Sequence, residues 1–148
     1  FRETEGDLPS VYRALIELPH AWSQPFAKFK TPHEFVVSTF RMCDFVPREP
    51  RQIAAPFQLL GQRPYSPGSP AGWPDTADHW DGSDALLKRI EWANALAERL
   101  GSKYRALELA NQSLGGHLSV YARTAISRAA DSAQALTLLL ASPAFQRR

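Results

Sequence analysis

Residues 61–82 most constrain how this chain can fold. They include four prolines and four glycines and show no amphipathic period, so a regular helix cannot run through them. Loops of this length are uncommon inside compact domains, where they are usually functional or disordered. Because Tyr65, Trp73 and Trp80 are too apolar for a free tail, we expect an ordered loop that wraps over neighbouring helices.

Helix signals precede this loop. Residues 8–18 begin with a proline at a helix start, show apolar residues at helical spacing, and are followed by a second proline that ends the pattern. The sequence Thr-Pro-His-Glu at residues 31–34 is a capping box, in which a threonine and a glutamate cap each other's backbone N–H groups. It predicts a helix over residues 32–44, and a third helix is predicted over residues 50–60.

Apolar periodicity assigns an inward face to each of these helices. In the helix over residues 32–44 the apolar stripe consists of Val36, Phe40 and Cys43, while Arg41 falls on a polar face. In the helix over residues 50–60 the residues predicted to point inward are Ile53, Ala54, Phe57 and Leu60.

A long central helix is predicted over residues 83–100, with Gly101 as its stop. The opposite side of this helix carries Lys88, Trp92 and Arg99, which leaves a tryptophan on a face that would otherwise be solvated. The predicted inward stripe is Leu86, Ile90, Ala93, Ala97 and Leu100.

Three shorter helices are predicted to complete the chain, over residues 103–112, 119–130 and 132–141. The last is apolar nearly all round, which suits a helix buried on several sides. No strand is predicted. The fold class is therefore all-α, an irregular bundle of about five to seven helices with one long ordered loop rich in Pro, Gly and Trp.

Composition limits the classes of partner. The chain has 148 residues, a length suited to one domain, and its 17 basic and 15 acidic residues are spread along the sequence. Without a cluster of Lys and Arg, a nucleic-acid partner is not expected. The most apolar stretch, residues 135–141, is far shorter than the roughly 20 residues that span a bilayer. The start lacks a Met and a signal pattern, so we interpret the chain as one domain from a longer protein.

Charged residues supply a first candidate site. Lys30, Glu34 and Arg41 lie near one helix face, and Arg89 could join them from the central helix. Two cations and a carboxylate could hold an anionic or sugar-like ligand through charge-assisted hydrogen bonds. The structural alternative, which we favour, is an ion-pair network that pins the long loop to the bundle.

The loop supplies a second candidate, a binding surface. Its aromatic residues could stack against sugar rings or proline-rich peptides, or they could anchor the loop in the core. Its acidic residues, close to a histidine, could bind a cation or move a proton, or they could cap turns. The four histidines are too widely separated for a zinc site, and no metal or cofactor is predicted. The loop residues assigned to this surface are Gln62, Tyr65, Trp73, Asp78, His79 and Trp80.

Several stretches occur together in one order. With Trp80 between the third and fourth, they are FKTPHEFVVSTFR (29–41), LGQRPY (60–65), GWP (72–74), ALLKRIEWAN (85–94) and LLASPAFQRR (139–148). The set resembles the C-terminal half of a bacterial family known as domain of unknown function 1800. The resemblance implies that residues 1–148 are the C-terminal portion of a longer exported protein, periplasmic or secreted. It implies no reaction, cofactor or catalytic residue.

Three interpretations of function follow. The leading one is a non-catalytic helical module that packs against the N-terminal portion of the parent protein or binds a saccharide or peptide. The second is a share in the cleft of a hydrolase-like enzyme, with Asp78, His79, Glu34 or Arg41 near the substrate. The third is a purely structural domain. Catalysis by this chain alone is disfavoured, because it has no Gly-x-Ser-x-Gly elbow and no glycine-rich phosphate loop.

Overall fold

A computed structural model describes residues 1–23, 26–100 and 103–148. Within these residues there are nine α-helices and no strand beyond a single β-bridge, so the all-α prediction is confirmed. The two helices of four residues, α2 and α9, were not predicted. The elements are α1 (Leu8–Ile16), α2 (Pro19–Trp22), α3 (Pro32–Met42), α4 (Pro50–Leu59), η1 (Ala77–His79), α5 (Ser83–Leu100), α6 (Ala106–Leu114), η3 (Gly115–His117), α7 (Val120–Ser127), α8 (Ser132–Ala141) and α9 (Pro143–Gln146).

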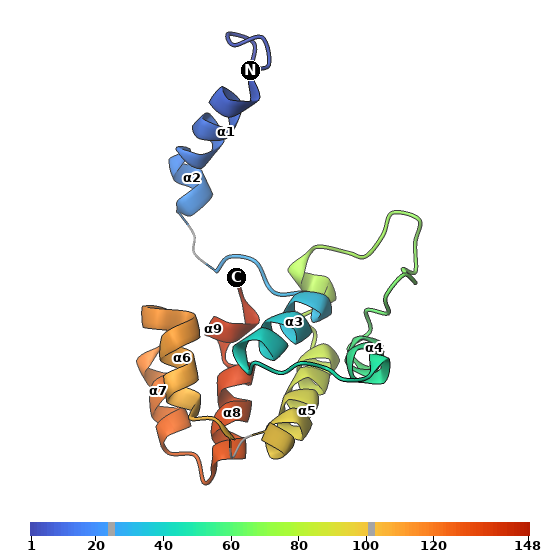
Figure 1. The fold of residues 1–148 in the computed structure, drawn as a ribbon, viewed down its shortest axis with the longest axis vertical. Helices are drawn as coiled ribbons and strands as arrows, with labels where there is room; N and C mark the ends of the chain where they lie inside the picture. Colours follow the sequence, from blue (N-terminus) through green and yellow to red (C-terminus); the bar gives the residue numbers. More distant parts are fainter. Residues whose placement is uncertain (24–25, 101–102) are drawn as a thin grey trace.

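The bundle is organised around α5 and α8, which pack against each other. Helix α8 also contacts α6 and α7, while α3 contacts α4 (Figure 1). The core contains Leu136, Leu139 and Leu140 of α8 together with Phe35 and Val36 of α3, all fully buried. Among the described helices, none is long and apolar enough to cross a membrane.

The predicted inward faces of α4 and α5 were partly wrong. Ile53 and Ala54 are exposed, whereas Phe57 and Leu60 are buried as predicted and Pro56 is buried with them. On α5 the buried face is rotated, so that Ile90 is 44% exposed and Trp92 only 9%. Burying the larger aromatic surface of Trp92 against Phe35 and Phe40 removes more apolar area from water than burying Ile90 would. Gly101, the predicted stop of α5, lies outside the described residues.

The long loop wraps over the helices only in its second half. Residues 63–71 are exposed throughout and extend away from the bundle (Figure 1). Tyr65 is fully exposed, so the expectation that it anchors the loop was wrong. Trp80 is buried, and its indole N–H donates to the Pro74 carbonyl at 2.9 Å, while Trp73 is half-buried. One indole therefore anchors the loop and the other remains partly open to solvent.

Residues 28–30, which lead into α3, pair with residues 146–148 at the C-terminal end of the chain. Phe29 and Arg147 form an isolated antiparallel bridge, and the backbones of Lys28 and Arg148 exchange hydrogen bonds of 3.1 and 2.9 Å. The Lys30 N–H donates to the Gln146 carbonyl at 2.8 Å. The C-terminal segment is therefore held beside the entry to α3, where the charged candidates lie.

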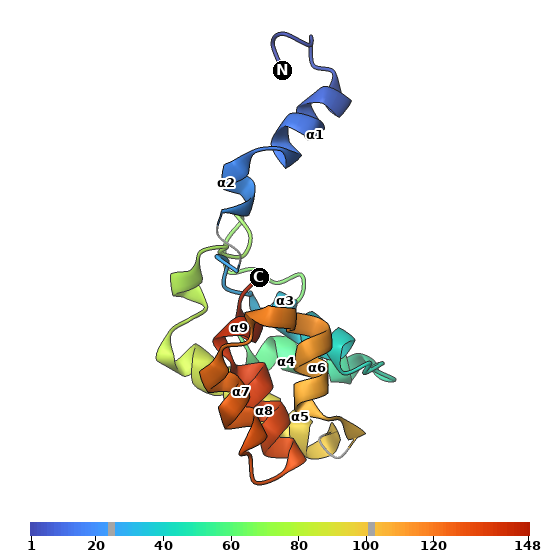
Figure 2. The same cartoon turned by 90° about the vertical axis from the view of Figure 1, so that its left-hand side faces the viewer.

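Helices α1 and α2 form an arm that extends away from the bundle in both views (Figures 1 and 2). Neither helix has a buried residue. The large apolar residues exposed on this arm are Phe1, Leu8, Tyr12, Leu15, Ile16, Leu18 and Trp22.

Candidate functional site

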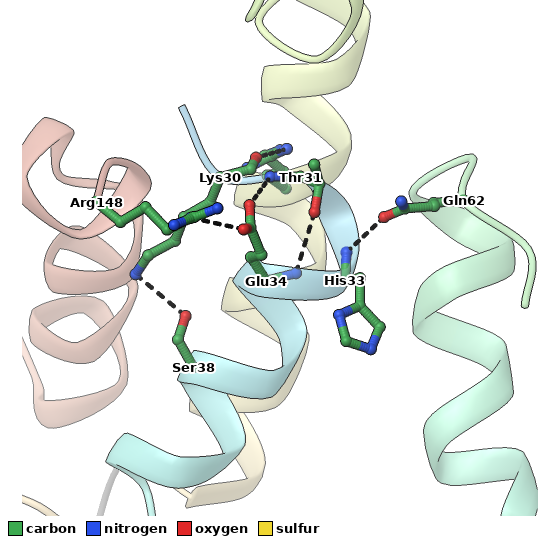
Figure 3. Close-up of polar contacts among 8 residues, drawn as sticks. Lys30, Thr31, His33, Glu34, Ser38, Gln62 and Arg148 are labelled. Atoms are coloured by element: carbon green, nitrogen blue, oxygen red, sulfur yellow. Dashed lines mark hydrogen bonds and ion pairs between the residues drawn. The ribbon is translucent and has the colours of Figure 1, made fainter. Parts of the chain in front are cut away.

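The start of α3 fixes the geometry of the charged candidates. Thr31 and Glu34 form the predicted capping box: the Glu34 N–H donates to Thr31 Oγ1 at 3.3 Å, and the Thr31 N–H donates to Glu34 Oε2 at 2.9 Å. A further N–H of this turn, that of His33, donates to Gln62 Oε1 at 2.7 Å (Figure 3). Gln62 therefore joins the beginning of the long loop to α3 and satisfies a helix N–H that has no partner within the helix.

Glu34 also forms an ion pair with the C-terminal segment. Its Oε1 lies 2.6 Å from Arg148 Nε, as Figure 3 shows. Partial burial alone would raise the pKa of Glu34. The Thr31 N–H and the Arg148 guanidinium outweigh that effect and hold the pKa below its ordinary value. Glu34 is therefore an ionised carboxylate with both oxygens engaged, poorly suited to donate a proton.

Arg89 is the largest fully buried side chain among the described residues. Its Nη1 donates to Gln146 Oε1 at 2.8 Å and its Nη2 donates to the Lys30 carbonyl at 2.7 Å. The guanidinium carbon lies 4.6 Å from the centre of the Phe29 ring and 5.1 Å from that of Phe35. Burial lowers the pKa of Arg89 to about 10, against the opposing effect of the more distant carboxylates. Neutral acceptors and aromatic faces thus stabilise this buried cation.

Lys30, whose carbonyl accepts from Arg89, is 8% exposed. Its Nζ donates to Ser38 Oγ at 3.1 Å and lies 3.9 Å from the centre of the Phe145 ring. Burial lowers the pKa of Lys30 to about 8; Glu34 opposes this shift, and Arg89 and the C-terminal Arg148 add to it. We call Lys30, Glu34, Arg89 and Arg148 the charged network.

The structure brings three of the four predicted charged residues together. Arg41 is the exception, because it is exposed and lines a different shallow groove with Asp44 and Val46. Arg148 takes the place beside Glu34 that the sequence interpretation gave to Arg41. Among the described residues, no buried side-chain nitrogen or oxygen lacks a hydrogen-bond partner. The buried polar atoms of the network are therefore already used within the fold.

The titration of Lys30 predicts how stability depends on pH. Burial disfavours the ammonium form in the folded state, so the unfolded chain binds more protons between the folded pKa of about 8 and the ordinary value of 10.5. The contribution of Lys30 to the free energy of unfolding is therefore expected to rise with pH across this window, so the wild type should gain stability relative to a variant without this lysine. Urea denaturation of the wild type and Lys30→Met at several pH values measures the effect, which the variant should lack.

Lys28→Met is the matched control, because Lys28 is exposed and two residues away. The control should keep the rise in stability. A wild-type free energy of unfolding that falls from pH 8 to pH 10 relative to Lys30→Met would contradict a buried ammonium at Lys30.

The second candidate site is a groove of about 590 Å³ between the long loop and the start of α5. We call it the loop groove. The rings of Trp73 and Trp80 lie 6.3 Å apart within it, and His79 meets Trp80 edge to face at 5.8 Å. On α5, Lys88 Nζ lies 2.6 Å from Asp84 Oδ2. Its lining residues are Leu60, Gly61, Gly68, Ser69, Gly72, Trp73, Pro74, His79, Trp80, Asp84, Ala85 and Lys88.

The loop groove includes only part of the predicted loop surface. Trp73, His79 and Trp80 line it, whereas Gln62 is bound to α3 and Tyr65 is exposed outside it. Asp78 is exposed, and a hydrogen bond with Thr76 holds its pKa below the ordinary value. Among the described residues there is no group of three or more His, Cys, Asp or Glu side chains placed to hold a metal ion.

Two charged residues of the loop groove were not predicted as site residues. Asp84 and Lys88 are spaced four apart at the start of α5, which puts them on one helix face. That spacing was visible in the sequence. The location of this pair in the groove that Trp73 lines was not visible in the sequence, because it depends on where the loop turns back toward α5.

The sequence profile of the family described as "Protein of unknown function (DUF1800)" matches residues 1–147. No curated protein and no solved structure matches the chain. A match over almost the whole length shows the family, and the chain belongs to this family of proteins of unknown function (DUF1800).

Proposed function

We propose that this chain is a non-catalytic recognition module that binds a saccharide in the loop groove. The observation that carries the proposal is the half-buried ring of Trp73, which lines a groove also lined by Asp84 and Lys88. Trp80, the second aromatic ring of the groove, is buried, and its indole N–H donates a hydrogen bond to the Pro74 carbonyl, which holds the ring in place.

The polar groups of the loop groove are available to a ligand, whereas those of the charged network are not. The side chains of Asp84 and Lys88 are 78% and 42% exposed, and their mutual ion pair is a weak surface contact. In contrast, Arg89 is 1% exposed and its guanidinium already donates to two acceptors within the fold. A ligand can therefore displace the contact between Asp84 and Lys88 at little cost.

The lining favours a sugar ring. A hexose presents apolar C–H faces edged by hydroxyl groups, so an indole can cover one face while a carboxylate and an ammonium bind the hydroxyls. Apolar walls with a few polar groups at one side are typical of small-molecule sites. The exposed loop residues 63–67 do not line the groove and are free to contact further units of a polymer.

A hydrolase-like cleft is less well supported. It would place Glu34, Arg41, Asp78 or His79 near the substrate, and of these only His79 lines the loop groove. Glu34 is paired with Arg148, and burial raises the pKa of the Cys43 thiol to about 11, which keeps it protonated. We further propose that the parent protein is exported, as the family resemblance implies, where surface polysaccharides would be accessible.

A thermal-shift screen with glucose, N-acetylglucosamine and their short β-linked oligomers tests the saccharide site, because a ligand that binds only the folded state raises the melting temperature. We expect at least one of these probes to raise it. Trp73→Ala should weaken binding about tenfold, the effect of one lost aromatic contact. Trp22→Ala, an indole on the arm that is 68% exposed, should bind normally. Absence of any shift, or equal binding by Trp73→Ala, would refute the proposal.

A further inference from the structure

Helix α1 presents an apolar face that nothing in the described chain covers. Leu8, Tyr12, Leu15 and Ile16 are each more than half exposed. They stand at positions i, i+4, i+7 and i+8, so they form one stripe along the helix. This spacing is the anchor pattern by which an amphipathic helix binds an apolar groove.

The bundle carries a groove of about 700 Å³ between α4 and α5, which we call the α4–α5 groove. Its floor is apolar, with the aromatic rings of Phe40, Phe45 and Trp92 and the aliphatic side chain of Leu59. Its charged lining residues are Glu49, Arg51 and Arg99. The charged lining is therefore net positive around an apolar floor.

Helix α1 is opposite to this groove in charge. Residues 1–23 carry four acidic and two basic side chains, opposite in sign to the charged lining of the groove. Asp7 and Glu17 flank the apolar stripe at its two ends, where they can approach Arg51 and Arg99.

We propose that α1 of one copy docks into the α4–α5 groove of a second copy, and that two chains exchange arms in a symmetric dimer. In both views the arm leaves the bundle on the side away from α5, which favours the groove of another molecule over its own (Figures 1 and 2). Each chain supplies one helix and one groove, so a two-fold arrangement forms both contacts at once and closes.

Sedimentation velocity of the full chain at increasing concentration tests the arm exchange. The wild type is expected to form dimers. Leu15→Asp on the arm and Leu59→Asp in the groove should each weaken dimerisation about tenfold or more, because each places a charge in an apolar contact. Both positions are at least 47% exposed, so the variants should keep the wild-type circular dichroism and melting temperature. Val120→Asp is the matched control, an exposed apolar residue outside both surfaces, and should still dimerise.

Mixing the two variants identifies the contact itself. Leu15→Asp retains a normal groove and Leu59→Asp retains a normal arm, so the mixture can form one intact contact and should sediment as a heterodimer. A wild type that stays monomeric would overturn the proposal. Helix α1 would then dock onto the groove of its own chain or onto another part of the parent protein. A dimer that survives Leu15→Asp, or a mixture that stays monomeric when each variant has lost its dimer, would also overturn it.

Discussion

Replacing Arg89 with alanine is expected to lower the free energy of unfolding by about 3 kcal/mol or more. The substitution removes a fully buried side chain that packs against Phe29 and Phe35. It also leaves Gln146 Oε1 and the Lys30 carbonyl without their donors. The loss combines a cavity with two unsatisfied buried acceptors, and urea denaturation measures it.

Two further variants separate these contributions. Arg89→Met fills most of the cavity but donates no hydrogen bond, so it should recover only part of the loss. Arg99→Ala, an exposed arginine on the same helix, should change stability by no more than about 0.5 kcal/mol. If Arg89→Ala were as stable as Arg99→Ala, the buried guanidinium would not hold the fold together.

The second large effect is expected at Gln146. Its amide accepts from Arg89 and donates to the Leu140 carbonyl at 2.9 Å, and its side chain is almost fully buried. Gln146→Ala removes a hydrogen bond to a charged group and leaves the Leu140 carbonyl unsatisfied, a loss of about 2–3 kcal/mol. The same denaturation experiment measures it.

Gln58→Ala is the control for this substitution, because Gln58 is an exposed glutamine on α4. It should leave the free energy of unfolding nearly unchanged. A Gln146→Ala variant as stable as this control would mean that Arg89 finds another acceptor when the amide is absent.

Local sequence signals predicted the helices well. The capping box at Thr31 and Glu34 is formed by short-range contacts, so it could be recognised without knowledge of the rest of the fold. The long loop was recognised from its prolines and glycines for the same reason. The rotation of α5 was missed because it depends on how Trp92 packs against α3, which periodicity alone does not reveal.

The candidate sites were harder to predict, because they depend on contacts between distant residues. Arg89 bonds to Gln146 across 57 positions and to Lys30 across 59. Arg148 replaced Arg41 beside Glu34 only because the C-terminal segment pairs with residues 28–30. Helical spacing could place Arg41 on a polar face, but it carried no information about the end of the chain.

The charged and aromatic residues fall into two groups, the charged network and the loop groove. The charged network joins α3, α5 and the C-terminal segment inside the fold. The loop groove presents Trp73, Asp84 and Lys88 to solvent, where a saccharide can reach them. We propose that recognition occurs in the loop groove and not at the charged network.

The most direct test is an NMR titration of the 15N-labelled chain with N-acetylglucosamine and glucose oligomers. We expect chemical-shift changes centred on the Trp73 indole and on residues 79–88, with the side-chain N–H signals of Arg89 unchanged. Changes centred instead on Lys30, Glu34 and Arg89 would show that the charged network is itself the ligand site and would contradict recognition in the loop groove.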